Sequence, residues 1–151
     1  MEFITERMED YLRAIYELEK SKGYARVKDI SCKLSVKPSS AVEMLRKLEE
    51  RGLVTHEKYG AVRLTERGRE LAEVVEKRYN YIRRFLEMLL VPEDAARRDA
   101  HILEHGLHPK TILQIIRFVD FIDKHRDHPR SITAWLRKFE RYCKEVEQKE
   151  Q

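Results

Sequence analysis

The chain has 151 residues, of which 42 % are hydrophobic and 38 % charged, with a formal net charge of +4 at pH 7. This composition is typical of a soluble, helix-rich protein of one large domain or two small ones. The sequence contains no run of about 18 apolar residues, which excludes a membrane-spanning helix, and its amphipathic start does not resemble a signal peptide. We therefore expect a cytoplasmic protein with no membrane partner. The net charge permits nucleic-acid binding without requiring it.

The first third of the chain has the pattern of a helix-turn-helix. Apolar residues recur at helical spacing between a potential N-cap, Thr5, and Gly23, which ends this first helix. Two more helices are predicted over residues 27–34 and 38–51, and Pro38 suits the first position of the latter. A tight turn between them would carry the second helix across the first. The buried stripe of the second helix is expected at Val42, Leu45 and Leu48.

The segment after this pair of helices has the pattern of a β-hairpin. Apolar and polar residues roughly alternate over residues 53–64, on both sides of the turn at Tyr59-Gly60. A hairpin that follows a helix-turn-helix forms the wing of a winged helix-turn-helix. We therefore predict such a domain over residues 1–64.

The rest of the chain has helical periodicity throughout. Thr65 is a potential cap for a long helix over residues 65–90, and further helices are predicted over residues 93–105, from Pro109 and from Ser131. The predicted fold class is therefore mainly α, with the winged helix-turn-helix followed by an all-helical domain over residues 65–151. The long helix links the two domains.

The winged helix-turn-helix predicts contacts with double-stranded DNA. The amino end of its second helix would enter the major groove, and the hairpin tip would lie against the phosphate backbone. The alternatives are ordinary solvated charges or a winged helix that binds another protein. The candidate DNA-binding residues are Lys28, Lys37, Ser39, Ser40, Glu43, Arg46, Lys47, Lys58, Tyr59 and Arg63.

A possible metal site lies in the predicted helix over residues 93–105. His101, Glu104 and His105 are spaced i, i+3 and i+4, which places their side chains on one helix face. Two imidazoles and a carboxylate suit Mn, Fe, Co, Ni or Zn, and a further ligand has to come from elsewhere. The alternative is a solvated helix face that binds no ion.

Two other interpretations of the histidines are open at this point. HxxEH is also the zinc motif of one class of metalloproteases, in which the Glu is the general base. A chain whose first third is a winged helix leaves little room for a substrate cleft. A second candidate cluster, in a polar segment between helices, comprises Asp123, His125, Asp127 and His128.

The order and spacing of several motifs resemble the DtxR/MntR family of iron- and manganese-dependent transcriptional repressors. The resemblance runs from about residue 5 to residue 145 and includes no counterpart of the family's third, SH3-like domain. In this respect the chain resembles the shorter, manganese-regulator branch. The segments that carry the resemblance are Met8–Leu18, Lys37–Val42, Leu64–Gly68 and Glu104–His105.

The resemblance implies a fourth metal ligand, Asp10, because the family completes one metal site with a residue early in its first helix. His101, Glu104 and His105 stand at three further ligand positions of that site. This mixed N/O ligand set favours Mn(II) or Fe(II), with Zn(II) or Co(II) as alternatives. The resemblance also implies that residues 65–151 form a metal-binding and dimerisation domain, with a twofold DNA operator and a second copy of the chain as partners.

The chain departs from the family at the second metal site that many members hold. Tyr79 stands where the family has a His, Arg83 where one branch has a Glu, and Arg97 near a further ligand position. Arg13 stands where the manganese branch has an acid. Guanidinium groups repel a cation, so we predict one ion per protomer. Arg83 or Arg97 is expected to supply the positive charge of the missing ion.

These observations together predict a metal-responsive repressor of metal-uptake genes that is not an enzyme. An ion held by Asp10 and the helix with His101 would tie the DNA-binding half to the dimerisation half and so favour the geometry that binds DNA. The alternatives are a winged-helix regulator that has lost metal control and the HxxEH zinc hydrolase.

Overall fold

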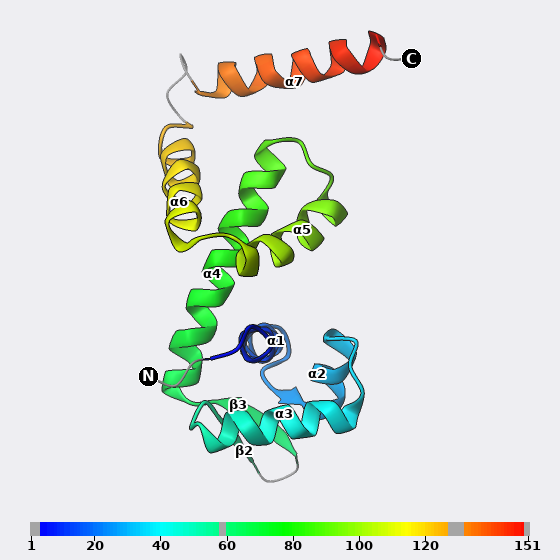
Figure 1. Cartoon of the computed structure of the whole chain (residues 1–151), viewed down its shortest axis with the longest axis vertical. Coiled ribbons are helices and arrows are strands. Elements are labelled where there is room, and N and C mark those ends of the chain that lie inside the picture. The colour runs from blue at the N-terminus through cyan, green and yellow to red at the C-terminus, as the bar shows by residue number, and fades with distance from the viewer. Residues whose placement is uncertain (1–3, 58–59, 127–131, 150–151) are drawn as a thin grey trace. The chain divides into compact units, whose positions relative to one another are not determined.

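The structure is a computed structural model that describes residues 4–57, 60–126 and 132–149. The chain divides into two compact units, Met1–Lys77 and Arg78–Gln151, and this division falls inside helix α4. The sequence-based boundary after residue 64 stays a prediction. The elements, labelled in Figure 1, are α1 (Glu6–Lys22), β1 (Ala25–Arg26), α2 (Val27–Lys33), α3 (Pro38–Glu50), β2 (Val54–His56), β3 (Ala61–Leu64), α4 (Glu66–Met88), α5 (Glu93–Gly106), α6 (Pro109–Lys124) and α7 (Ile132–Lys149).

The helix ends of the N-terminal unit follow from local side-chain and backbone chemistry. The Thr5 hydroxyl accepts a hydrogen bond from the Met8 backbone N–H at 3.3 Å, and Gly23 ends α1 in the left-handed conformation with φ 80°. Both predicted caps of α1 are confirmed. Ser35 in the turn between α2 and α3 also has a positive φ, 52°, and Pro38 opens α3.

The sheet of the N-terminal unit has three strands in the order β1-β3-β2, all antiparallel. The predicted hairpin corresponds to β2 and β3, in which Val54 pairs with Leu64 and His56 with Val62. The two-residue strand β1 was not predicted, because so short a segment has no alternation to detect. It pairs Ala25 with Val62 and so fastens the segment between α1 and α2 to the wing.

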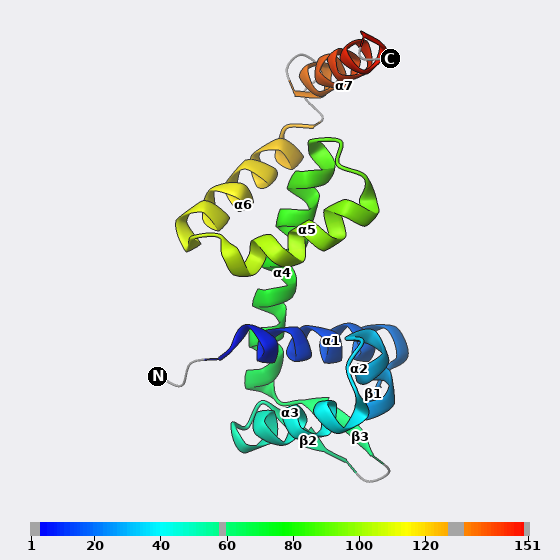
Figure 2. The same ribbon diagram turned by 45° about the vertical axis from the view of Figure 1, so that its right-hand side comes forward.

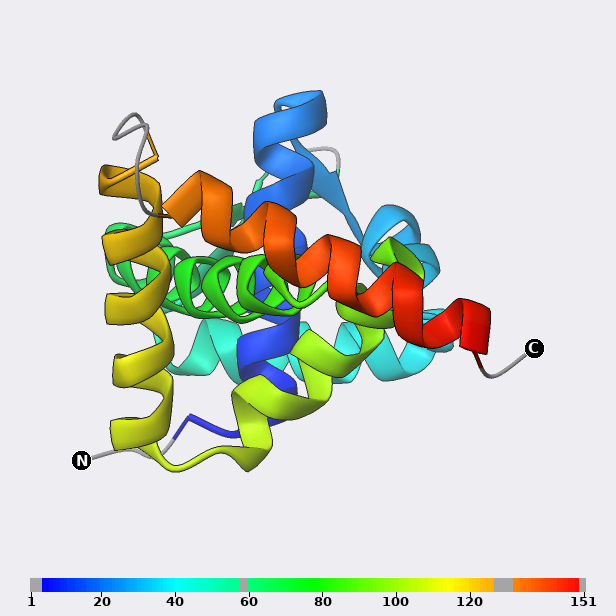
Figure 3. The same ribbon diagram turned by 90° about the horizontal axis from the view of Figure 1, so that it is seen from above.

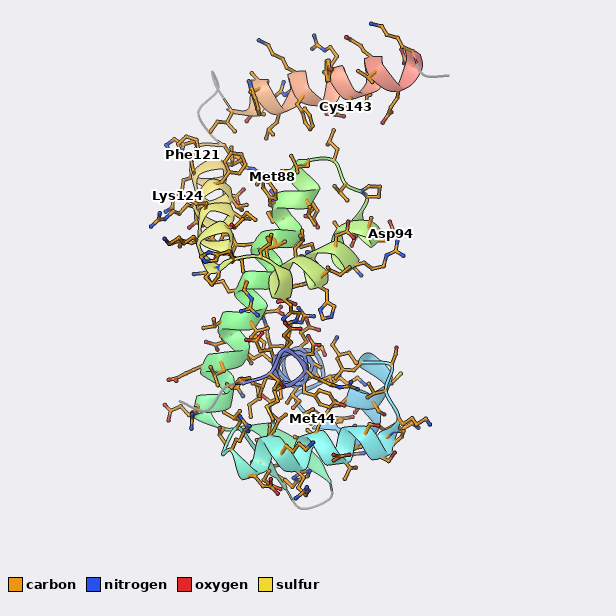
Figure 4. All side chains as sticks on the ribbon, in the orientation of Figure 1. Met44, Met88, Asp94, Phe121, Lys124 and Cys143 are labelled. Atoms are coloured by element: carbon orange, nitrogen blue, oxygen red, sulfur yellow. The ribbon has the colours of Figure 1, made fainter. Side chains whose placement is uncertain are left out.

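The core of the N-terminal unit corrects one sequence-based prediction. Val42 was assigned to the buried stripe of α3, but its side chain is 53 % exposed, whereas Ala41 is fully buried. The small Ala41 allows α3 to approach its neighbours closely, and Met44 packs at the edge of the same core (Figure 4). Other core residues include Tyr11, Leu12, Ile15, Ile30, Leu45, Leu48, Leu53 and Val62.

The C-terminal unit is built on the last part of α4. Ala96 and Ala100 of α5 are fully buried in one cluster with Ile82, because their small side chains let α5 approach α4 closely. On α6, Val119 packs in a second cluster with Met88 of α4, whose side chain Figure 4 labels. Figure 2 shows α5 and α6 beside this part of α4.

Helix α7, which Figure 3 displays along its length, differs from the other helices of the C-terminal unit. None of its described residues is buried, although Ile132 and Leu136 pack at the edge of the cluster around Met88. Trp135 and Tyr142 are largely exposed. Among the described helices, α7 included, none has the length and apolar character to cross a membrane.

The start of α4 is held against the end of the helix-turn-helix by hydrogen bonds of Thr65 and by a close backbone contact at Gly68. The Thr65 hydroxyl accepts a hydrogen bond from the Gly68 N–H at 3.0 Å and donates one to the Gly52 carbonyl at 2.7 Å, which confirms the predicted cap. The Leu53 carbonyl, which accepts the Thr65 N–H at 3.1 Å, lies directly over Gly68. A Cβ atom at residue 68 would be 1.9 Å from that carbonyl oxygen.

Gly68→Ala is therefore expected to destabilise the protein although alanine favours helices. Relief of the clash requires a backbone shift, and overpacking of this kind typically costs about 1–3 kcal/mol. The matched control is Gly106→Ala in α5, where a Cβ atom meets nothing within 4 Å and where the substitution should be neutral or stabilising. Urea unfolding of both variants would measure the difference, and equal stability of the two would contradict the packing argument.

Candidate metal centre and nucleic-acid interface

The amino end of α3 has the character expected of a helix that meets a polyanion. Lys37 is its N-cap residue without a side-chain cap hydrogen bond, and the first turn contains no acidic residue. Ser39 and Ser40 are exposed there. The positive end of the helix dipole and its N–H groups are therefore available to a phosphate.

Two ion pairs lie further along the exposed face of α3. Glu43 pairs with Lys47 at 3.1 Å, and Arg46 pairs with Glu50 at 2.5 Å. These i,i+4 pairs are solvent-exposed and contribute little to stability. Their basic members can therefore exchange a carboxylate for a phosphate or a base edge at small cost.

Val42 is a candidate contact that the sequence reasoning missed. Its exposed side chain lies on the same helix as Ser39 and Arg46, and its methyl groups suit the methyl group of a thymine. The signal was present in the sequence, because Ala41 was an equally valid member of the buried stripe.

The wing residues are placed only in part. Lys58 and Tyr59 lie outside the described residues. The Arg63 guanidinium donates to the Gly23 carbonyl at 2.8 Å and pairs with Glu57 at 3.3 Å, so it ties the wing to the end of α1. Lys28 of α2 is exposed. The roles of these residues in DNA binding stay predictions.

The three predicted metal ligands of the C-terminal unit lie together, with both imidazoles close to one oxygen of the Glu104 carboxylate. His101, Glu104 and His105 each offer a ligand atom, and these atoms lie within 4.8 Å of one another. Glu104 Oε1 is 3.3 Å from His101 Nδ1 and 3.7 Å from His105 Nε2. The two imidazole rings meet edge to face at a centroid distance of 5.3 Å.

The surroundings of Glu104 distinguish this cluster from a solvated helix face. The Glu104 side chain is 0 % exposed, although a glutamate is rarely buried without compensating charge. Arg78 of α4 lies beside it, with 3.7 Å between Arg78 Nε and Glu104 Oε2. Sequence reasoning did not single out Arg78.

The arginines that were expected to replace a second ion have other partners. Arg83 pairs with Glu87 at 3.5 Å, and its guanidinium lies 6.0 Å from the ring centre of Tyr79. Arg97 pairs with Glu93, and its backbone carbonyl accepts a hydrogen bond from the Tyr79 hydroxyl at 3.5 Å. The Tyr79 side chain therefore links α4 to the backbone of α5, and the guanidinium beside Glu104 is that of Arg78.

His108 and His125 have structural partners. His108 caps α6 by accepting the Lys110 N–H at 3.2 Å. In the second candidate cluster, His125 contacts the Phe121 carbonyl at 2.7 Å, and Asp123 pairs with Arg84 and Arg126. Asp127 and His128 of that cluster lie outside the described residues.

Asp10 belongs to the N-terminal unit, where it lies half-buried on α1. Arg13, on the next turn, pairs with Glu17 at 4.0 Å. The C-terminal unit by itself provides two imidazoles and one buried carboxylate. That donor set fits a divalent transition metal and leaves coordination positions for further ligands.

Comparison with known families accounts for most of the chain. Residues 3–62 match the model of the iron dependent repressor N-terminal DNA binding domain, and residues 65–133 match that of the iron dependent repressor metal binding and dimerisation domain. Helix α7 lies almost wholly beyond the second match.

Individual relatives agree with the family models. The chain is 36 % identical to the HTH-type transcriptional regulator MntR of Lysinibacillus sphaericus, over 86 % of this chain and 94 % of that protein. It is 38 % identical to the MntR of Geobacillus kaustophilus, over 80 % and 85 %. Because these relatives are named as transcriptional regulators, they give the hydrolase alternative no support.

A solved structure leads to the same conclusion. A manganese-dependent transcriptional repressor in complex with manganese matches with a TM-score of 0.69 and 32 % identity, over 76 % of this chain and 53 % of that chain. This chain thus spans about half the length of that solved chain. The two family models and these relatives together show that the chain belongs to the DtxR/MntR family of iron- and manganese-dependent repressors.

Proposed function

We propose that the chain is a metal-responsive, sequence-specific DNA-binding regulator that acts in the cytoplasm as a repressor of metal-uptake genes. The observation that carries this proposal is the convergence of two imidazoles on a buried carboxylate in a chain with an iron dependent repressor DNA-binding domain. A buried carboxylate flanked by histidines favours binding of a cation. The winged helix would then respond to that binding with a change in its affinity for DNA.

The fourth ligand in this proposal is Asp10. It stands at the family's ligand position in the first helix, and it belongs to the N-terminal unit whereas the other three ligands belong to the C-terminal unit. An ion held by both sets would restrict the motion of the DNA-binding unit. Binding then shifts the population towards the DNA-competent arrangement, provided that the ion binds this arrangement more tightly.

The proposed ion is Mn(II) or Fe(II), with Zn(II) or Co(II) as alternatives. Two carboxylates and two imidazoles form a mixed ligand set without thiolate or thioether, which suits the harder ions of this series. The ion supplies a double positive charge that holds these groups together. The residues of the chain provide the selectivity, through the number and kind of their donor atoms.

The proposed active form is a homodimer that binds a twofold operator. The C-terminal unit exposes large apolar side chains on α6, namely Leu113, Phe118 and Phe121, of which Figure 4 labels Phe121, and its family model is a dimerisation domain. A second copy of this unit would bury such side chains. The two winged helices of a dimer could then meet major grooves about 34 Å apart.

A second candidate function is that of a regulator without metal control. The ion pair between Arg78 and Glu104 favours it, since a guanidinium already neutralises the buried carboxylate. In that case the DNA-binding unit would need no ion for operator binding. The two functions differ in whether chelation abolishes DNA binding.

Metal dependence is tested by DNA affinity measured with a chelator and with a panel of divalent ions. We expect chelation to weaken operator binding at least about tenfold, as for a typical allosteric coupling, and Mn(II) or Fe(II) to restore it. His101→Ala should abolish the response, whereas His125→Ala, which alters a histidine outside the cluster, should retain it. Operator binding that is equally tight in chelator would instead support the regulator without metal control.

The number of ions per chain is a separate prediction. Tyr79, Arg83 and Arg97 stand at or near sequence positions where the family holds its other metal, and positive side chains oppose a second cation. Isothermal titration of the metal-free protein with Mn(II) should therefore give one tight equivalent per chain. Two tight equivalents would show that Arg83 and Arg97 do not exclude a second ion.

The role of α3 is tested with the pair Arg46 and Glu50. Arg46→Ala should weaken operator binding by about 1–3 kcal/mol if Arg46 reads a base, or reduce the salt slope by about one if it contacts a phosphate. Glu50→Ala frees the Arg46 guanidinium from its exposed partner and should leave affinity unchanged or raise it. If Arg46→Ala changes neither affinity nor salt slope, Arg46 is not part of the interface.

A further inference from the structure

The two oxygens of the Glu104 carboxylate face different groups. Oε1 faces the imidazoles, at 3.3 Å from His101 Nδ1 and 3.7 Å from His105 Nε2. Oε2 faces α4, at 3.7 Å from Arg78 Nε, and both of these atoms are buried from solvent. One oxygen of the carboxylate is therefore available to an ion held by the histidines, while the other lies next to the arginine.

The position of Arg78 on α4 suggests that this contact is built into the fold. Val75 and Ile82 are buried on the same helix, three residues before and four residues after Arg78. Arg78 thus lies on the buried stripe of α4, with its side chain 21 % exposed. A charged side chain placed there needs a counter-charge, and Glu104 of α5 supplies one.

We infer that Arg78 is a built-in counter-charge that lies against the buried Glu104 carboxylate in the metal-free protein and thereby limits how tightly the site holds an ion. A guanidinium remains protonated at any physiological pH, so its charge is permanent. It stabilises the buried carboxylate before an ion arrives, and it repels the ion afterwards. Arg78 is a positioning residue in this scheme, because it acts through Glu104.

This inference rests on the proposed function and deepens it. A sensor has to release its ion when the cellular concentration falls, so very tight binding would make it unresponsive. Because the Arg78 guanidinium already balances the charge of Glu104 in the metal-free protein, ion binding is less favourable than it would be at a buried carboxylate without a counter-charge. The effect differs from that expected for Arg83 or Arg97, whose guanidiniums pair with Glu87 and Glu93.

The test compares Arg78→Met, which retains an apolar stem of similar length, with Arg78→Lys, which retains the charge. In the full-length metal-free protein, Arg78→Met should lower the melting temperature by roughly 10 °C, because it leaves Glu104 buried without this counter-charge. Titration with Mn(II) should show binding at least about tenfold tighter than in the wild type, because the repulsion is gone. Arg78→Lys should stay close to the wild type in both measurements.

Two further variants separate counter-charge from packing. Arg78→Met combined with Glu104→Gln removes both charges, and its metal-free melting temperature should recover most of the loss. Arg98→Met, at an exposed pair with Asp94 on α5, should change neither quantity. If Arg78→Met fails to fold while the double variant folds, the counter-charge is supported; if both fail to fold, Arg78 acts through packing and the inference is wrong.

The result that would overturn the inference is an unchanged or weaker Mn(II) affinity in Arg78→Met, or an unchanged melting temperature. Failure of the proposed function is distinguishable from this. If the wild-type protein binds no Mn(II), metal control fails, but the melting temperatures of the four variants still decide whether Arg78 compensates Glu104.

Discussion

The burial of one carboxylate is the constraint on which the C-terminal unit depends. Glu104 has no exposed side-chain surface, and an ionised carboxylate in that position is tolerated only where positive charge or hydrogen-bond donors surround it. The residues beside it, two histidines on one side and Arg78 on the other, meet this requirement. An ion held by the histidines would meet it more strongly. A cation bound there would therefore add to an electrostatic compensation that the fold already provides.

The division of the chain into two units explains why such a site could control DNA binding. The donor cluster around Glu104 belongs wholly to the unit of residues 78–151, and the exposed face of α3 belongs wholly to the other. Neither unit alone makes the DNA affinity depend on an ion. In the proposed function, Asp10 on α1 would supply that dependence, because an ion shared between the units would add a free-energy term that exists only in one arrangement of them. The α3 dipole and the α5 donor cluster would then act as separate parts of one switch.

Much of this architecture could be predicted from the sequence, because the signals were local. Thr5 and Thr65 are confirmed as helix caps, and the i, i+3, i+4 spacing placed His101, Glu104 and His105 together without knowledge of the rest of the fold. The errors have a different origin. Val42 and Ala41 are adjacent, and helical periodicity alone does not decide which of them is buried. The choice depended on how closely α3 approaches its neighbours, which is a tertiary property.

Arg78 was missed for a related reason, but its signal was readable. The sequence-based prediction considered the arginines that stand at the family's second metal site, and these included Arg83 and Arg97 but not Arg78. Judged by periodicity instead, Arg78 falls between Val75 and Ile82 on the stripe that α4 buries, where a charge is anomalous unless a partner of opposite sign faces it. Glu104 is equally anomalous on the buried side of α5, beside Ala100. Two charges of opposite sign, each out of place on its own helix, predict that the helices pack with those residues in contact.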